Sequence, residues 1–235
     1  MKSTALKIFL AFYGLFFLGL LCVVLCISQS DLHIALTLDY LSNFSPDWVA
    51  FQDIFFKYMT EWGSWVPFVV VGVLLFYKVG DSLFVLLPQL LLGIVVRIIK
   101  VNAAAPRPSL YFSTHFSDVA LHQVDGVVQH HTNSFPSGHT ATVFSLMLCL
   151  TLIFNKKSWL APIFFVLAVL AAYSRIYLSQ HFAEDVLVGS LAGVLITMFV
   201  YWLYQRKLYA WEDKSVVELF RNMNFKKNIG TGVSV

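Results

Sequence analysis

Six long apolar runs dominate this chain of 235 residues, and they limit what it can fold into. Only 12% of the residues are charged, about half the share that a soluble domain of this length carries. No single water-soluble core of this size buries so much apolar surface, so soluble, disordered and collagen-like chains are excluded. The sequence predicts an all-α integral membrane protein, a bundle of six transmembrane helices. The runs cover approximately residues 8–29, 63–77, 82–99, 140–154, 158–175 and 185–204.

No internal repeat or low-complexity tract divides the chain, so we expect a single domain over residues 1–235. Lys2 and Lys7 precede the first run as in a signal sequence, but the run is long enough to span a membrane. No small-residue cleavage site follows it, so we expect an uncleaved first helix. Residues 205–235 are basic and are predicted to form a cytoplasmic tail. The net charge of +3, without a dense basic run, argues against a nucleic-acid partner.

The segment from Phe44 to Trp62 differs from the six runs. Ser45 can cap a helix, and Pro46 is suited to its first position. Aromatic residues then recur at spacings of 3, 4, 3 and 4, which places them on one helix face. We expect an amphipathic helix in the membrane interface, with an ordinary helix packed on the bundle as the equal alternative. The aromatic residues are Trp48, Phe51, Phe55, Tyr58 and Trp62.

Charge predicts the orientation of the bundle. Six spans put both termini on one side, and if that side is the cytoplasm it holds 11 of the 16 Lys and Arg residues. This bias follows the positive-inside rule. All histidines then fall on the outer side, and so do four cations at span ends, where the rule disfavours them. Such cations are explained most simply by an anion that they bind. The four are Arg97, Lys100, Arg107 and Arg175.

Three polar clusters on the outer side have the composition of a phosphate site. Three cations, one lysine and two planar guanidinium groups, suit a phosphoryl group. A serine–glycine–histidine turn opens the fourth run, where unpaired backbone N–H groups at a helix start attract anions. The clusters are Lys100 with Arg107-Pro108, Pro136-Ser137-Gly138-His139, and Ser174-Arg175 with His181 and Asp185.

The third cluster also contains a candidate nucleophile. His181 and Asp185 are four residues apart, so at the start of the sixth run they share a helix face. The Asp185 carboxylate can then fix one imidazole nitrogen as a donor and leave the other free to attack. His139 is left for general acid catalysis on the departing oxygen.

These three motifs resemble the signature of the type 2 phosphatidic acid phosphatase superfamily, which includes glucose-6-phosphatases and vanadium haloperoxidases. The resemblance covers Lys100 to Asp185, the motif region 100–185, with every signature position present. It implies a helical enzyme that removes phosphate through a phosphohistidine intermediate, without a metal or another cofactor. By position, His181 resembles the nucleophile, Asp185 its orienting carboxylate and His139 the acid. The phosphate cradle is carried over onto Lys100, Arg107, Ser137, Gly138 and Arg175.

The sequence therefore predicts a bacterial inner-membrane lipid phosphatase with its active site facing the periplasm. Candidate substrates are lipid A phosphate, undecaprenyl diphosphate and phosphatidylglycerol phosphate, entering from the outer leaflet. The alternatives are a phosphatase for soluble sugar or nucleotide phosphates, and a catalytically silent transporter or scaffold. The histidine-bearing loop 109–134 is the expected place for specificity, with solvated histidines favoured over a zinc site. Arg97 lies outside the motifs and is expected to snorkel to the membrane surface, or to contact residues that themselves bind the phosphate.

Overall fold

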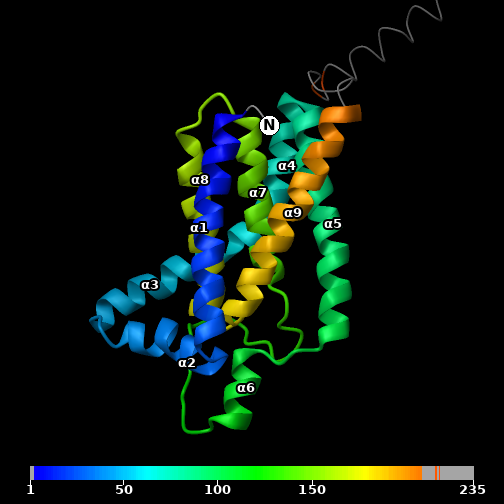
Figure 1. Ribbon diagram of the computed structural model, residues 1–235. Coiled ribbons are helices and arrows are strands. Elements are labelled where there is room, and N and C mark those ends of the chain that lie inside the picture. The colour runs from blue at the N-terminus through cyan, green and yellow to red at the C-terminus, as the bar shows by residue number, and fades with distance from the viewer. Residues whose placement is uncertain (1–2, 208–214, 216, 218–235) are drawn as a thin grey trace, which may run out of the picture.

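The computed structural model describes residues 3–207, 215 and 217, and every regular element in this part of the chain is helical (Figure 1). The all-α prediction is confirmed. Two short helical segments, the π-helix η1 and the 3₁₀-helix η2, extend α2 and α3. The elements are α1 Thr4–Cys26, α2 Gln29–Ile34, η1 Ala35–Asp39, α3 Pro46–Met59, η2 Thr60–Gly63, α4 Val66–Tyr77, α5 Val79–Ala103, α6 Pro108–His115, α7 Gly138–Ile153, α8 Leu160–Tyr177 and α9 Ala183–Lys207.

Helix α7 forms the centre of the bundle and contacts α1, α5, α8 and α9. Its contact with α9 is a close backbone approach. A Cβ atom on Gly189 would lie 2.5 Å from the Ser137 carbonyl oxygen, and one on Gly193 would collide with the Ala141 carbonyl. Glycine is therefore required on this face of α9. The approach fixes the start of α9 against the start of α7, which is where the second and third motifs lie.

Each of the six predicted apolar runs forms a helix, but not all of these helices are equally suited to crossing a membrane. Helices α1, α5, α8 and α9 are long and apolar enough. The α3–η2 segment and α4 form a fifth candidate that is bent by 54°. Helix α7 is apolar but has only 16 residues, and α4 has 12, about 18 Å. The structure thus supports four or five spans, and the count of six stays a prediction.

Helix α3 forms where the aromatic periodicity predicts it and begins at Pro46. Its aromatic face points away from the bundle, with Trp48, Phe51 and Tyr58 exposed. The opposite face is buried, and Phe56 contacts Tyr177 of α8 with ring centroids 4.5 Å apart. The helix projects sideways from the bundle (Figure 1). An exposed aromatic face suits a membrane interface, and that location stays a prediction.

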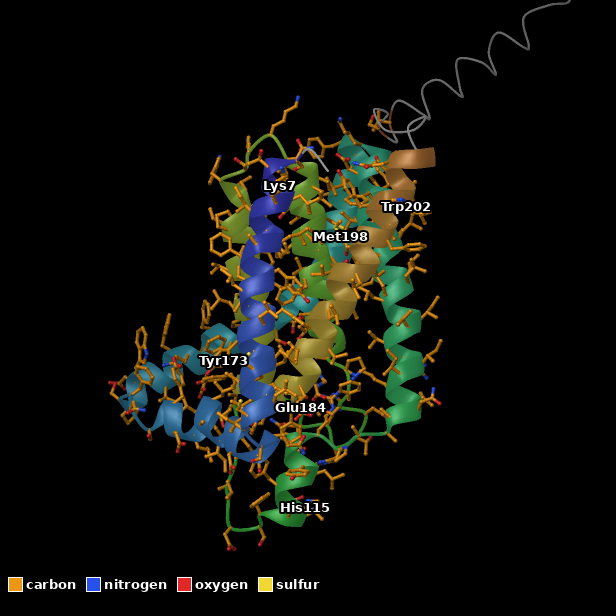
Figure 2. All side chains as sticks on the ribbon, in the orientation of Figure 1. Lys7, His115, Tyr173, Glu184, Met198 and Trp202 are labelled. Atoms are coloured by element: carbon orange, nitrogen blue, oxygen red, sulfur yellow. The ribbon has the colours of Figure 1, made fainter. Side chains whose placement is uncertain are left out.

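The two ends of the bundle differ in composition. Figure 2 shows Lys7 and Trp202 at one end and His115 and Glu184 at the other. Lys78, Lys156 and Lys157 line a common pocket at the Lys7 end. We call the two ends the lysine-rich end and the histidine-rich end. The predicted tail, residues 205–235, lies outside the described residues except for 205–207, 215 and 217.

Candidate active site

The three motifs meet at the histidine-rich end because the helices that carry them begin or end there. Motif one follows from the last turn of α5, motif two opens α7, and motif three joins α8 to α9. The charges of Lys100, Arg107 and Arg175 all act on both His139 and His181. The structure therefore gathers the predicted catalytic and cationic residues into one site.

His181 and Asp185 form a buried pair with a third member, Ser134. The Nδ1 atom of His181 lies 3.3 Å from Oδ2 of Asp185. The Ser134 hydroxyl donates to the same Oδ2 at 2.5 Å, and the backbone N–H of Phe182 donates to it at 2.9 Å. His181 is 1% exposed and Asp185 4%. The carboxylate is thus held by two other donors while it orients the imidazole, which leaves Nε2 free for chemistry.

The protonation state of His181 follows from its surroundings. Burial is the main cause that lowers its pKa well below the usual 6.5, and the positive charges of Arg175, Arg107 and Lys100 lower it further. The imidazole is therefore neutral at pH 7. Neutral imidazole has the free electron pair that a nucleophile needs.

Lys100 and Arg107 are held by the loop that leads into α7 and by the turn before α9. The Lys100 ammonium donates to the carbonyl oxygens of Asn133 at 2.6 Å and Ser134 at 3.1 Å. The Arg107 guanidinium donates to the Thr132 carbonyl and, through Nη1, to the Gln180 side chain at 2.9 Å. These contacts fix the orientation of the two cationic side chains, so less conformational entropy is lost when an anion binds.

Arg175 is the most deeply buried of the three cations, at 6% exposed. Its Nη1 atom donates to the hydroxyl of Thr60 in η2. Its Nε atom is buried without a partner among the described residues. A buried, incompletely paired guanidinium is costly unless an anion completes its hydrogen bonds.

The start of α7 has the geometry of an anion site. The Ser137 hydroxyl caps the helix, accepting hydrogen bonds from the backbone N–H and the hydroxyl of Thr140. Ser137 is fully buried, and its own N–H donates to the Asp185 carbonyl at 2.9 Å. A Cβ on Gly138 would only touch Val96 at 3.5 Å, so packing does not demand glycine there. The glycine instead leaves the first backbone N–H groups of α7 uncovered.

His139 lies in the first turn of α7 and is partly exposed. Gly63 of η2 packs directly against the His139 backbone, since a Cβ on Gly63 would lie 2.5 Å from the His139 carbonyl oxygen. Thr142 reinforces this contact by donating to the Gly63 carbonyl. The ring nitrogens of His139 form no hydrogen bond with another described residue, so they remain available to a ligand.

Sequence reasoning missed the residues that hold the motif side chains in place. Ser134 lies just before the second motif, so its position was the available signal, but no spacing rule predicts its bond to Asp185. Thr60 and Gln180 carry no signal, because Thr60 is 115 positions from its partner Arg175. His33 is also buried here, 3.3 Å from the Ser179 hydroxyl, and burial lowers its pKa to about 4.

The histidine-bearing loop 109–134 is tied to α3 and to the cradle. His122 lies 2.7 Å from Asp53, which also accepts a hydrogen bond from the Tyr177 hydroxyl. His130 and His131, with Lys100 and Arg107, line a pocket of about 290 Å³ at the mouth of the site. No three His, Cys, Asp or Glu side chains gather as metal ligands anywhere in the described chain.

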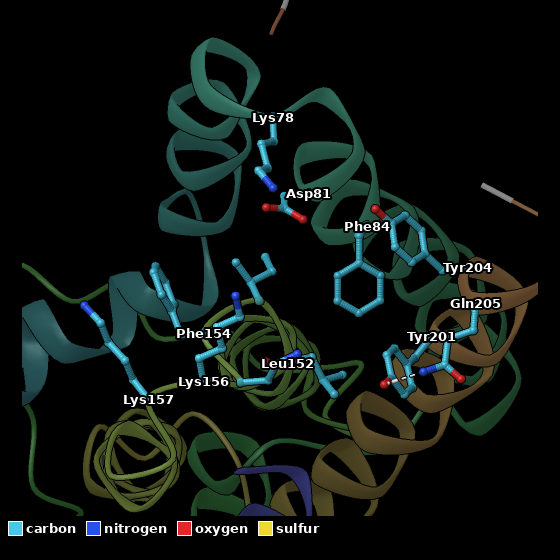
Figure 3. Close-up of a pocket in the computed structure, with 12 residues that line it drawn as sticks. Lys78, Asp81, Phe84, Leu152, Phe154, Lys156, Lys157, Tyr201, Tyr204 and Gln205 are labelled. Carbon is cyan, nitrogen blue, oxygen red and sulfur yellow. Dashed lines mark hydrogen bonds between the residues drawn. The ribbon is translucent and has the colours of Figure 1, made fainter. Parts of the chain in front are cut away.

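A larger pocket, about 660 Å³, lies at the lysine-rich end (Figure 3). Lys78 and Asp81 border it on one side and Tyr201 and Tyr204 on another. Its position at the far ends of α7 and α9 separates it from every motif residue. Volume alone therefore does not identify the site in this molecule, whereas convergent chemistry does.

Several bacterial proteins are similar in sequence to parts of this chain. Bacitracin transport permease protein BcrC of Bacillus licheniformis is 40% identical over 83 residues, 35% of this chain and 39% of that protein. The lipid A 1-phosphatase of Porphyromonas gingivalis is 38% identical over 72 residues, 30% of this chain and 16% of that protein. A putative undecaprenyl-diphosphatase of Escherichia coli, YbjG, is 36% identical over 92 residues, 35% and 45% of the two chains. The chain thus matches less than half the length of each of these relatives.

A solved structure is similar to this chain over most of the length of both proteins. The crystal structure of Aquifex aeolicus LpxE matches with a TM-score of 0.58 and 26% sequence identity, over 73% of this chain and 93% of that one. The sequence model of the PAP2 superfamily matches residues 82–209, more than half of the chain. This range contains all three motifs, so the resemblance drawn from them is confirmed. The chain belongs to the PAP2 superfamily.

Proposed function

We propose that this protein is a membrane phosphatase that hydrolyses a lipid phosphate monoester or diphosphate. The observation that carries the proposal is the buried His181–Asp185 pair surrounded by Lys100, Arg107 and Arg175. A neutral imidazole among three cations suits attack on a phosphoryl group, because the cations stabilise its charge while the imidazole remains nucleophilic. The apolar bundle around the site favours a substrate that itself resides in the membrane.

The mechanism that we propose has two steps. The Nε2 atom of His181 attacks phosphorus, the bond between phosphorus and the lipid-bearing oxygen breaks, and His139 gives a proton to that oxygen. The three cations also act on His139, so we propose that it holds this proton only when the negative charge of the bound phosphoryl group offsets them. Water then attacks the phosphohistidine, the P–N bond breaks, and a proton passes to His139 as phosphate leaves. Lys100, Arg107, Arg175 and the backbone N–H groups at Gly138 hold the phosphoryl oxygens throughout. Ser137 supports this site as the helix cap. No step requires a metal ion.

Candidate substrates are lipid A phosphate, undecaprenyl diphosphate and phosphatidylglycerol phosphate. The names of two relatives, a lipid A 1-phosphatase and a putative undecaprenyl-diphosphatase, support the first two. We place the protein in a bacterial inner membrane with both termini cytoplasmic and the site in the periplasm, because this puts the lysine-rich end inside. A phosphatase for soluble sugar or nucleotide phosphates is the second candidate.

A catalytically silent transporter is the alternative that the name of the relative BcrC, a transport permease, favours. The complete His181–Asp185–Ser134 arrangement argues against a protein without catalytic activity, since buried pairs of titratable groups are typical of functional sites.

The test is phosphate release by the purified full chain from the three candidate lipids and from a sugar phosphate, with His181→Ala as the blank. We expect lipid turnover that survives strong chelation and is lost in the blank. Release from the sugar phosphate alone would favour the second candidate. No release from any substrate, or release restored to chelated protein only by a divalent metal, would reject the proposed mechanism.

A further inference from the structure

Arg97 is a cation on the exposed, apolar side of α5, without a partner among the described residues. It is exposed, and it forms no hydrogen bond or ion pair with any described residue. Its neighbours on the same face, Ile94, Ile98 and Val101, are each more than half exposed. The apolar side chains around Arg97 offer its guanidinium no hydrogen-bond acceptor, so an anionic ligand would complete its hydrogen bonds.

Beside Arg97 lies an apolar groove of about 610 Å³, a volume within the range of ligand pockets. It exists because α4 is shorter than α5. The two helices are joined at Lys78 and run antiparallel, so the 12 residues of α4 end opposite the middle of α5 (Figure 1). Phe68 of α4 closes one wall, and Gly93 opens the floor, since nothing lies within 4 Å of a Cβ placed there.

Arg97 connects the apolar groove to the phosphate cradle, because it lines the groove and lies one helical turn before Lys100. The groove extends along α5 from Gln89 to Asn102, so its apolar lining flanks Arg97 on both sides. Arg97 and Lys100 are three residues apart, about 4.5 Å along the helix axis. At this spacing their long side chains can contact two neighbouring phosphates of one molecule whose hydrocarbon chain lies along the groove.

We propose that Arg97 and this groove form a second substrate-binding site, which takes the inner phosphate and the hydrocarbon of a lipid diphosphate. The terminal phosphate is then the one transferred to His181, and the inner phosphate remains on the lipid. Arg97 is a specificity-determining residue, and the inference rests on the proposed function.

The test compares two lipids that differ only in the inner phosphate, a polyprenyl diphosphate and the matching polyprenyl monophosphate, with p-nitrophenyl phosphate as a soluble substrate. The full chain is assayed in neutral phosphatidylcholine nanodiscs, so that bulk anionic lipid does not compete. For Arg97→Gln we expect kcat/KM for the diphosphate to fall about 10-fold, mainly through KM, as for loss of one charge-assisted contact. The monophosphate and the soluble substrate should change less than about twofold, and Arg97→Lys should keep most of the activity.

The groove is tested by Gly93→Leu, which fills open space without a clash. We expect a loss with both lipids and none with p-nitrophenyl phosphate. Gly19→Leu is the matched control, because Gly19 has equally open space but lies on α1, on the other side of the bundle. Equal losses of lipid turnover from the two glycine variants would overturn the proposal that the groove binds the hydrocarbon chain.

Arg97→Gln losses that are equal for both lipids, or no loss at all, would overturn the inner-phosphate site while wild-type lipid turnover still supports the proposed function. If the wild type turned over p-nitrophenyl phosphate but neither lipid, the proposed lipid phosphatase activity would itself fall, and this inference with it.

Discussion

Ser134 and His181 share one carboxylate oxygen: Oδ2 of Asp185 accepts a 2.5 Å hydrogen bond from the Ser134 hydroxyl and lies 3.3 Å from Nδ1 of His181. Ser134 comes from the loop before α7, whereas the other two residues flank the start of α9. The orientation of the candidate nucleophile therefore depends on the packing of these two segments, and not on its own helix alone.

Removing the Ser134 hydroxyl should slow catalysis without preventing it. In Ser134→Ala, Asp185 keeps the Phe182 N–H but loses one donor, so we expect kcat to fall roughly 10-fold to 100-fold, as for other supporting hydrogen bonds. Asp185→Asn should lose about 10²–10⁴-fold, because the tautomer is no longer fixed. Ser190→Ala, a buried serine elsewhere on α9, is the control for both. Equal activity of Ser134→Ala and the control would contradict the shared-oxygen arrangement.

His181→Ala should abolish turnover of every substrate while the protein stays folded in detergent. Quenching the wild type with labelled substrate under alkaline conditions, where phosphoramidates survive, should leave label on His181. Label found on serine or aspartate would assign the nucleophile elsewhere.

His139→Ala should separate substrates by how much their leaving groups need a proton. A lipid monoester leaves as an alkoxide, so loss of the acid should cost about 10²–10⁴-fold. The phenolate of p-nitrophenyl phosphate is stable without a proton and should depart at nearly the wild-type rate. If both rates fall by the same factor, His139 binds phosphate and is not the acid.

The pH dependence of kcat/KM should report the lowered pKa of His181. The neutral form is active, so activity is lost as pH falls through that pKa, and the acid limb should lie below pH 6.5. Arg107→Gln removes one of the cations that lower the pKa, so it should move the limb upward. Lys57→Gln, on α3, removes an outer charge that is not among those causes and should leave the limb in place. A wild-type limb above pH 6.5 would be inconsistent with a buried His181 among three cations.

Gly189→Ala should destabilise the bundle, because the new Cβ would lie 2.5 Å from the Ser137 carbonyl oxygen and push α9 from α7. The thermal unfolding midpoint in detergent should fall, and with it the activity, since Asp185 moves with α9. Gly19→Ala meets no atom within 4 Å and should stabilise α1 by about 0.5–1 kcal/mol or leave it unchanged. Unfolding midpoints that do not differ between the two variants would argue against the close helix contact.

The sequence by itself determined the helices and the composition of the site. Apolar run length predicts helices because a bilayer leaves backbone groups no other partners, and each predicted run forms one. The spacing of His181 and Asp185 predicts their contact because both lie within one helical turn. The three motifs were enough to predict the family, since their residue types and order are specific to it.

Only the tertiary structure decided how these pieces are held together. Arg175 meets Thr60 across 115 residues, and Ser134 meets Asp185 across 51, so both contacts depend on helix packing and not on local spacing. The groove beside Arg97 arises because α4 is too short to cover α5, a relation between two helices that neither sequence segment contains alone. Local periodicity determines a helix and its faces, whereas the partner of each face depends on contacts between distant segments that form only when the whole bundle packs.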